Sequence, residues 1–314
     1  MKKILVIGSL NMDISVQLDR VPNAGETLTG NRLLTSPGGK GANQAYAIGK
    51  LGGDVAMLGA VGQDAYGDEL CQSLASVGVD VSGIRHVKGG NTGTAVIMVE
   101  SNGENRIVIL PGTNACVNSG YIDENIDMLK RCDILLMQLE IPLDTVVYAA
   151  KKAKELGKTV IVDPAPATAD VPEELWSYVD YIKPNESELN TILTGKTDGL
   201  SLNEALAQVQ SLGVRNVWVT LSGKGVFVRD KNGHEELVPA IRVEAVDTTA
   251  AGDSFLAAAT LSLAKGLSDA EAVTYGNRVA AVAVTRHGAQ QSVPTPEEVE
   301  AFLGLPVMDS LVLE

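Results

Sequence analysis

Short apolar runs alternate with longer amphipathic stretches along this chain. Each run is bounded by glycine, proline or polar residues, which is typical of buried strands. We expect six central strands, at 3–8, 55–62, 133–140, 159–166, 180–185 and 216–223. Helix periodicity appears at 41–51, 68–77, 143–156, 202–212, 252–264 and 269–285. This order predicts an α/β fold whose mostly parallel sheet is covered on both faces.

Three segments depart from that order. The stretch "DISVQLD" (13–19) alternates apolar and polar residues, as a half-exposed strand does. Residues 92–112 predict a hairpin around Asn102-Gly103, and residues 225–239 predict another around Asn232-Gly233. We expect the first two segments to form a small sheet that stands off the main one as a lid. The chain is then one domain, 1–314, with lid segments at about 11–37 and 91–110.

The charge balance limits the partners. The chain has 25 Lys and Arg against 39 Asp and Glu, a net charge of −14, which disfavours nucleic acid and anionic membranes. Residues 4–7 are too short an apolar run for a signal peptide, and no segment is long enough to span a membrane. The three cysteines lack disulfide or zinc spacing, so we expect a cytoplasmic protein.

Polar residues follow the predicted strands where ligands bind in open parallel sheets, at the carboxyl ends. Asn11 and Asp13 follow the first strand, and Glu140 follows "DILLMQ". Together with Asn43, these groups would suit sugar hydroxyls. The glycines of "GGKGAN" (38–43) either open a helix or let a polar ligand approach the backbone, with Lys40 and Asn43 as donors.

Two further segments also leave alternatives open. In "NESE" (185–188), Asn185 and Glu188 are either an N-cap with its capping-box glutamate or part of a hydrated Mg²⁺ site. In "TLSGKG" (220–225), the glycines serve the turn or line a nucleotide phosphate path.

The stretch "VDTTAAGDSF" (246–255) carries the strongest chemistry. Small residues at Ala250, Ala251 and Gly252 leave backbone N–H groups uncovered at a predicted helix start. Asp253 follows in the first turn, as a cap or as a base that takes a proton from a hydroxyl while the amides hold a phosphoryl group. A Walker A loop, a nucleophile elbow, zinc-protease spacing and a dinucleotide fingerprint after the first strand are missing from the sequence.

These segments together resemble the phosphofructokinase-B-type carbohydrate kinase family, and within it the enzymes that phosphorylate ribose. The resemblance covers nearly the whole chain. It rests on "GSLNMD" (8–13), "PGGKGANQA" (37–45), "MQLE" (137–140), "KPNESE" (183–188), "VDTTAAGDSF" (246–255) and "AVTRHGAQQSV" (283–293). It implies a three-layer α/β/α fold with a small β lid that often forms a dimer clasp.

The resemblance also implies roles for particular residues. Asp253 would be the general base, with the amides of Ala250, Ala251, Gly252 and Asp253 as the anion hole. The implied sugar set is Asn11, Asp13, Gly39, Lys40, Gly41, Ala42, Asn43 and Glu140. The implied nucleotide set is Asn185, Thr220, Leu221, Ser222, Gly223, Lys224, Gly225, Gly252 and Asn277, with Glu188 ordering Mg²⁺ through water. The implied monovalent-cation set is Asp247, Thr249, Ala283, Arg286, Gly288 and Ser292.

The expected activity is ATP-dependent phosphorylation of the 5-hydroxyl of D-ribose, with Mg²⁺ and K⁺ as cofactors and a homodimer formed through the lid. Another sugar kinase of the same family, acting on 2-deoxyribose, fructose or a nucleoside, is the nearest alternative. A sugar-binding regulator without activity is a more distant one, because Asp253 and "NESE" are intact.

Overall fold

The computed structural model describes residues 1–102, 104–193 and 200–304. Its main sheet has eight strands, and the expected parallel arrangement is confirmed, with an antiparallel pair of strands added at one edge. In spatial order the strands are β14 (Glu235–Val238), β13 (Val226–Arg229), β12 (Asn216–Thr220), β11 (Tyr181–Ile182), β10 (Thr159–Val162), β9 (Ile134–Met137), β1 (Ile4–Ile7) and β4 (Val55–Leu58).

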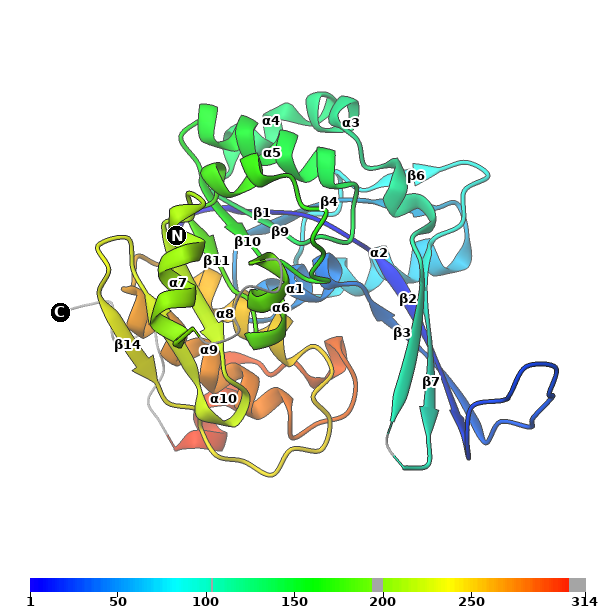
Figure 1. Cartoon of the computed structure of the whole chain (residues 1–314). Helices are drawn as coiled ribbons and strands as arrows, with labels where there is room; N and C mark the ends of the chain where they lie inside the picture. The colour runs from blue at the N-terminus through cyan, green and yellow to red at the C-terminus, as the bar shows by residue number, and fades with distance from the viewer. Residues whose placement is uncertain (103, 194–199, 305–314) are drawn as a thin grey trace.

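Helices cover both faces of this sheet (Figure 1). One face carries α1 (Lys40–Lys50), α2 (Ala65–Ser76), α8 (Ala251–Ala264), α9 (Asp269–Ala283) and α10 (Pro296–Leu303). The other carries α3 (Ser119–Glu124), α4 (Ile126–Arg131), α5 (Leu143–Glu155), α6 (Glu186–Ile192) and α7 (Leu202–Ser211). Strand β1 supplies both cores, because Ile4 and Val6 point to the first and Leu5 and Ile7 to the second. Such two-sided burial explains the continuous apolar runs.

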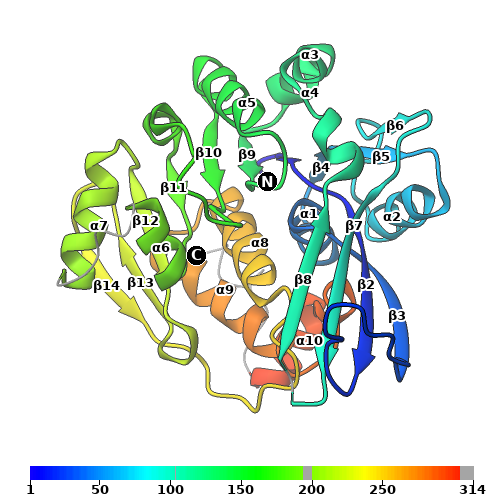
Figure 2. The ribbon, with the colours of Figure 1, turned by 45° about the vertical axis from the view of Figure 1, so that its right-hand side comes forward.

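A second, four-stranded sheet stands beside the body (Figure 2). Its strands are β3 (Arg32–Gly38), β2 (Asn11–Leu18), β7 (Gly93–Glu100) and β8 (Asn105–Leu110), in this order. We call it the lid sheet. The expected pairing of 92–112 as a hairpin is confirmed, although Gly103 of its turn lies outside the described residues. Strand β3 had no predicted counterpart.

One predicted central strand is confirmed only in its first half. The run 55–62 is divided at Gly59 into β4, in the main sheet, and β5 (Ala60–Gly62), which pairs with β6 (Arg85–Val87). The Gly59 amide donates to the Tyr121 hydroxyl at 3.0 Å, and its carbonyl accepts from the same hydroxyl at 2.9 Å. These long-range bonds mark the point where the chain leaves the main sheet. The local sequence pattern does not predict them.

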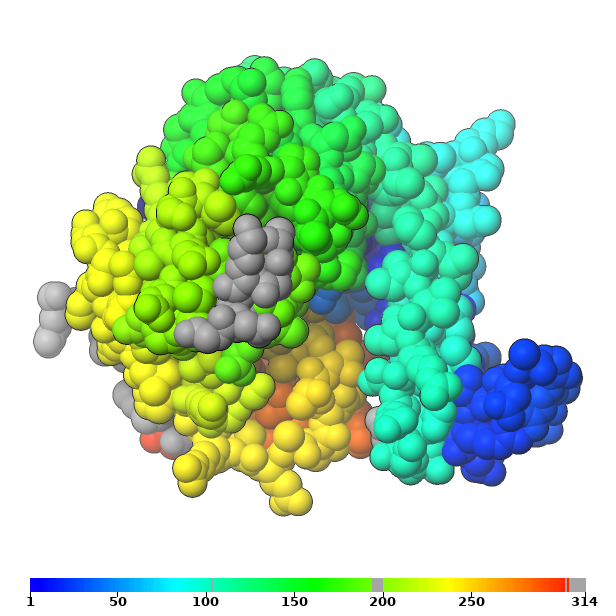
Figure 3. Space-filling model, in the orientation of Figure 1, coloured from blue at the N-terminus to red at the C-terminus, as the bar shows by residue number. Residues whose placement is uncertain are grey.

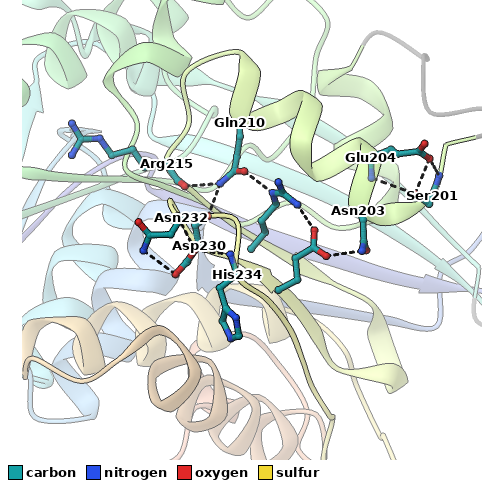
Figure 4. A network of polar contacts seen from close by, with 10 residues as sticks. Ser201, Asn203, Glu204, Gln210, Arg215, Asp230, Asn232 and His234 are labelled. Carbon is teal, nitrogen blue, oxygen red and sulfur yellow. Dashed lines mark hydrogen bonds and ion pairs between the residues drawn. The ribbon is translucent and has the colours of Figure 1, made fainter.

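The edge hairpin β13–β14 is anchored to α7 by a polar network (Figure 4). Gln210 of α7 accepts from Arg229 Nε at 2.6 Å and donates to the carbonyl of Asp230 at 2.8 Å. Asn203 donates to Glu235 at 2.6 Å. The anchored hairpin holds the segment after β12, where Ser222, Gly223 and Gly225 line a large cavity. No helix in the described part of the chain has the length and apolarity needed to cross a membrane.

Candidate active site

The carboxylate of Asp253 lies at the centre of the site, in the first turn of α8. Ala250, the residue before α8, is its N-cap and makes no side-chain hydrogen bond to the helix. It has φ 55°, a left-handed conformation that disfavours larger side chains. The helix end therefore presents backbone N–H groups instead of a polar cap. Asp253 itself is only 7% exposed.

The amides at this helix end are not equivalent. The N–H of Ala251 donates to the Thr248 carbonyl at 3.2 Å, so that donor is engaged within the loop. Gly252 and Asp253 follow in the first turn, where an α-helix offers no acceptor for an N–H group. All of these residues line one cavity. The geometry thus favours Gly252 and Asp253 as the anion-binding amides.

Two buried amides hold the Asp253 carboxylate. Asn43 Nδ2 donates to Oδ2 at 3.1 Å, and Gln44 Nε2 donates to Oδ1 at 2.9 Å. Gln44 Nε2 also donates to Asp163 Oδ2 at 2.9 Å, while Gln44 Oε1 accepts from Gln138 at 2.6 Å. The Gln44 side chain therefore has one fixed orientation and links two carboxylates. The sequence reasoning missed it, because these partners lie 119 and 209 residues away.

The predicted sugar-binding side chains gather where the lid sheet meets α1. The Lys40 amide donates to Glu140 at 3.0 Å, and the Ser9 hydroxyl also donates to Glu140. Burial, together with the nearby charges of Glu140 and Asp253, raises the pKa of Asp13 from 3.8 to about 7. Asp13 is therefore close to both carboxylates, within the same cluster of candidate sugar-binding groups.

Asn11 is buried beside this cluster. Its Oδ1 accepts from Asn114 Nδ2 at 2.7 Å, and Asn114 also bonds the backbone of Leu10. Asn114 is a second residue that the sequence reasoning missed. It orients the Asn11 amide, because a nitrogen donor must face an oxygen acceptor.

Three residues of the glycine-rich segment serve packing. Gly39 has φ 86°, which permits the sharp entry into α1. A Cβ at Gly41 would lie 2.7 Å from the Ser9 nitrogen, so only glycine fits against the backbone that follows β1. The Ala42 amide donates to the Ser9 carbonyl, and its methyl group is fully buried. For Gly41 and Ala42 the structure thus shows a packing role.

Asp253 and Lys40 both line a cavity of about 830 Å³. Most of the predicted nucleotide residues line it, namely Asn185, Thr220, Ser222, Gly223, Gly225, Gly252 and Asn277. Leu221 packs into the second core, and neither it nor Lys224 is part of the lining. Residues 240–243 and Ala245 form a wall that the sequence reasoning did not predict. Figure 3 shows the open cleft between the lid sheet and the body.

Of the two interpretations of "NESE", the structure confirms the capping box. Asn185 Oδ1 accepts from the Glu188 amide, and Glu188 Oε2 accepts from the Asn185 amide, each at 2.8 Å, so the capping box is present. Both residues also line the cavity. With Asp163 nearby, they offer hard oxygen donors of the kind Mg²⁺ takes. Within the described residues, no cluster of three His, Cys, Asp or Glu is placed to hold a metal ion.

The loop before α8 is tied to the segment after α9. Asp247 accepts from the amides of Thr249 and Gly288, both at 2.9 Å. Burial opposes ionisation of Asp247, but its bonds to Thr249 and Gly288 outweigh burial and lower its pKa. Ala283 ends α9, and its carbonyl accepts from the Arg286 amide. The Arg286 guanidinium pairs with Glu298, and Ser292 Oγ donates to the Ala289 carbonyl.

Two charged residues of the site were not singled out from the sequence. Lys183 follows β11, Asp163 follows β10, and Lys183 Nζ lies 3.0 Å from Asp163 Oδ1. Both are buried and both line the cavity. The sequence signal for Lys183 was its place in "KPNESE" (183–188), directly before the residues predicted to bind the nucleotide.

Comparison with known proteins agrees with this arrangement. Residues 1–296 match the pfkB family carbohydrate kinases. A curated ribokinase of Haemophilus influenzae is 39% identical, covering 96% of this chain and 98% of its own. A deoxyribokinase of Salmonella typhi is 35% identical, covering 96% and 99%.

Solved structures show the same likeness. A ribokinase of Thermotoga maritima has a TM-score of 0.89 at 41% identity, covering 97% of this chain and all of that one. The Arabidopsis thaliana ribokinase, solved with ribose and ATP, has a TM-score of 0.90 at 32% identity, covering 97% and 99%. From its sequence, its fold and the polar groups around Asp253, this chain belongs to the pfkB family of carbohydrate kinases.

Proposed function

We propose that this protein transfers the γ-phosphoryl group of ATP to the 5-hydroxyl of D-ribose. One observation carries the proposal. The Asp253 carboxylate is held by Asn43 and Gln44 at a bare helix N-terminus, where it lines a nucleotide-sized cavity and adjoins the candidate sugar-binding cluster. The ribokinase relatives, and the Arabidopsis enzyme solved with ribose and ATP, support the same substrates.

The reaction is an in-line displacement. The 5-hydroxyl oxygen attacks the γ-phosphorus as the bond from that phosphorus to the β,γ-bridging oxygen breaks. The bridging oxygen keeps the electron pair and leaves in ADP, and the hydroxyl proton passes to Asp253. The amides of Gly252 and Asp253 stabilise the charge on the transferring group. Mg²⁺, placed near Glu188 and Asn185, would neutralise the phosphate oxygens of ATP when bound.

The sugar is assigned to the cluster formed by Asn11, Asp13, Lys40, Asn43 and Glu140. The test is a panel of ribose, 2-deoxyribose, fructose and adenosine with Mg²⁺ and ATP, comparing kcat/KM and locating the phosphate by NMR. Ribose is expected to give the highest kcat/KM and a 5-phosphate product. The 35% identity to a deoxyribokinase makes 2-deoxyribose the second candidate, and a higher kcat/KM for that sugar would replace ribose in the assignment.

We also propose a K⁺ site at Asp247, Thr249, Ala283, Arg286, Gly288 and Ser292. A cation there would add positive potential to the loop that leads into α8. We expect K⁺ in place of Na⁺, at constant ionic strength, to raise kcat several-fold, and Asp247→Asn to remove most of that difference. Equal rates in the two salts would eliminate the site.

We further propose a single kinase domain that dimerises through the lid sheet. Pairing places Asp13, Ala95 and Ile109 at one register, so their side chains share the face that continues through Ile97 to Ile107. Ile107 and Ile109 are 55% and 44% exposed on the edge strand β8, which is a surface suited to a second copy.

The dimer is tested by light scattering after gel filtration. Ile107→Lys is expected to give monomers where the wild-type chain gives dimers. Leu237→Lys is the matched control, because Leu237 is 49% exposed on β14, the edge strand of the main sheet. A monomeric wild-type chain, or dissociation by Leu237→Lys alone, would contradict the lid interface.

A further inference from the structure

Lys183 lies next to the first turn of α8, the helix end to which the proposed function assigns the phosphoryl group. It is 5% exposed and follows β11, where its amide donates to the Val162 carbonyl. A Cβ added to Gly252 would lie 3.2 Å from Lys183 Nζ. The ammonium group is therefore adjacent to the first turn of α8, on the wall of the cavity.

Packing alone does not account for a lysine at this position. Burying an ammonium and a carboxylate costs desolvation, and such a pair is often replaced by apolar residues of similar volume without loss of stability. Within the described residues, Asp163 is the carboxylate paired with Lys183, and Asp163 Oδ2 accepts from Gln44. An ammonium has three N–H donors, which is more than the ion pair with Asp163 uses.

A second cation stands in the same cavity. Lys40 begins α1 and also lines the cavity. Burial opposes the charge of Lys40, but the carboxylates of Asp253, Asp163 and Glu140 outweigh burial and raise its pKa. The two lysines come from different elements, and Gln44 connects the Lys183–Asp163 pair to Asp253.

We propose that Lys183 donates to the γ-phosphoryl oxygens of ATP, opposite the amides of Gly252 and Asp253, and holds that group during its transfer. This role rests on the proposed kinase function. Asp163 then acts as a positioning residue, because it holds Lys183 directly and Asp253 through Gln44. The transfer keeps the bond changes given above, and Lys183 exchanges no proton in it.

The test compares two nucleotides. In Lys183→Met, which keeps the side-chain length and removes the charge, calorimetry with Mg²⁺ would measure binding of ADP and of the β,γ-imido analogue of ATP. Affinity for the analogue should fall about 10- to 100-fold, the effect of one lost charge-assisted hydrogen bond, and affinity for ADP should stay within about threefold. Turnover with ribose should fall about 10²–10³-fold.

Lys154→Met is the matched control. Lys154 Nζ pairs with the buried Asp180 at 2.7 Å, outside the cavity, so its loss has the same chemistry without a phosphate nearby. It should leave both affinities and turnover unchanged. Equal weakening of ADP and the analogue by Lys183→Met, or weakening of neither, would overturn the proposal.

Two further arms keep the result interpretable. If Lys183→Met fails to fold because Asp163 is left unpaired, the double variant Asp163→Asn/Lys183→Met removes both charges and should show the same loss of preference for the analogue. The binding measurement does not need ribose turnover. If the wild-type chain phosphorylates ribose and Lys183→Met keeps its preference for the analogue over ADP, only the role of Lys183 is refuted. If the wild-type chain binds the analogue but does not phosphorylate ribose, only the substrate assignment is refuted.

Discussion

Asp253→Asn is expected to fold and to lose about 10²–10⁴-fold in turnover with ribose, the usual contribution of a positioned base. Asparagine cannot accept the hydroxyl proton. It also offers one oxygen where Asp253 accepts from both Asn43 and Gln44, so one of the two donors loses its acceptor. We expect the lost bond to lower the free energy of unfolding by about 1–3 kcal/mol.

The measurement is single-turnover phosphorylation of ribose at saturating ATP, together with urea unfolding. Asp68→Asn is the matched control, because Asp68 is an exposed acid in the first turn of α2. It should match the wild-type chain in both assays. If Asp253→Asn kept a near-normal rate, the proton would have to leave by another route.

Asp13→Asn is expected to stabilise the ligand-free protein at neutral pH. Burial, followed by the charges of Glu140 and Asp253, raises the pKa of Asp13 from 3.8 to about 7. The unfolded chain releases this proton near pH 4, whereas the folded chain holds it until about pH 7. The folded state therefore binds more protons between these values, and its free energy of unfolding falls as the pH rises through them.

Asparagine has no such proton, so the stability advantage of Asp13→Asn should widen by roughly 2–3 kcal/mol between pH 5 and pH 8. Urea unfolding at several pH values measures it. Asp19→Asn, at an exposed position just beyond β2, is the control and should show a constant difference from the wild-type chain. A constant difference for Asp13→Asn as well would mean that Asp13 ionises normally. Above pH 7, where Asp13 is ionised in the folded chain, the same variant should also raise KM for ribose, since an ionised acceptor is lost.

The sequence alone predicted most of the elements, although not β3 or the division at Gly59, and it predicted Asp253 at a helix start. Apolar runs such as 4–7 predicted strands buried on both faces. Successive residues of such a strand point into one core or the other, so no position faces solvent and none is polar. Alternation in 13–19 and the hairpin at 92–112 predicted the lid sheet. The small residues before Asp253 predicted bare amides at a helix start, since the backbone conformation there depends on local sterics.

Only the tertiary structure decided which groups face one another. Gln44 joins Asp253 to Asp163, Asn114 orients Asn11, and Lys183 lies over Gly252. Each contact joins residues that are far apart in sequence and are brought together by the sheet order. The same holds for Gly59, where a hydroxyl from α3 divides a run that local pattern treats as one strand. Periodicity and backbone sterics are local properties that a sequence displays directly, whereas hydrogen-bond partners and burial of charge depend on how distant elements pack.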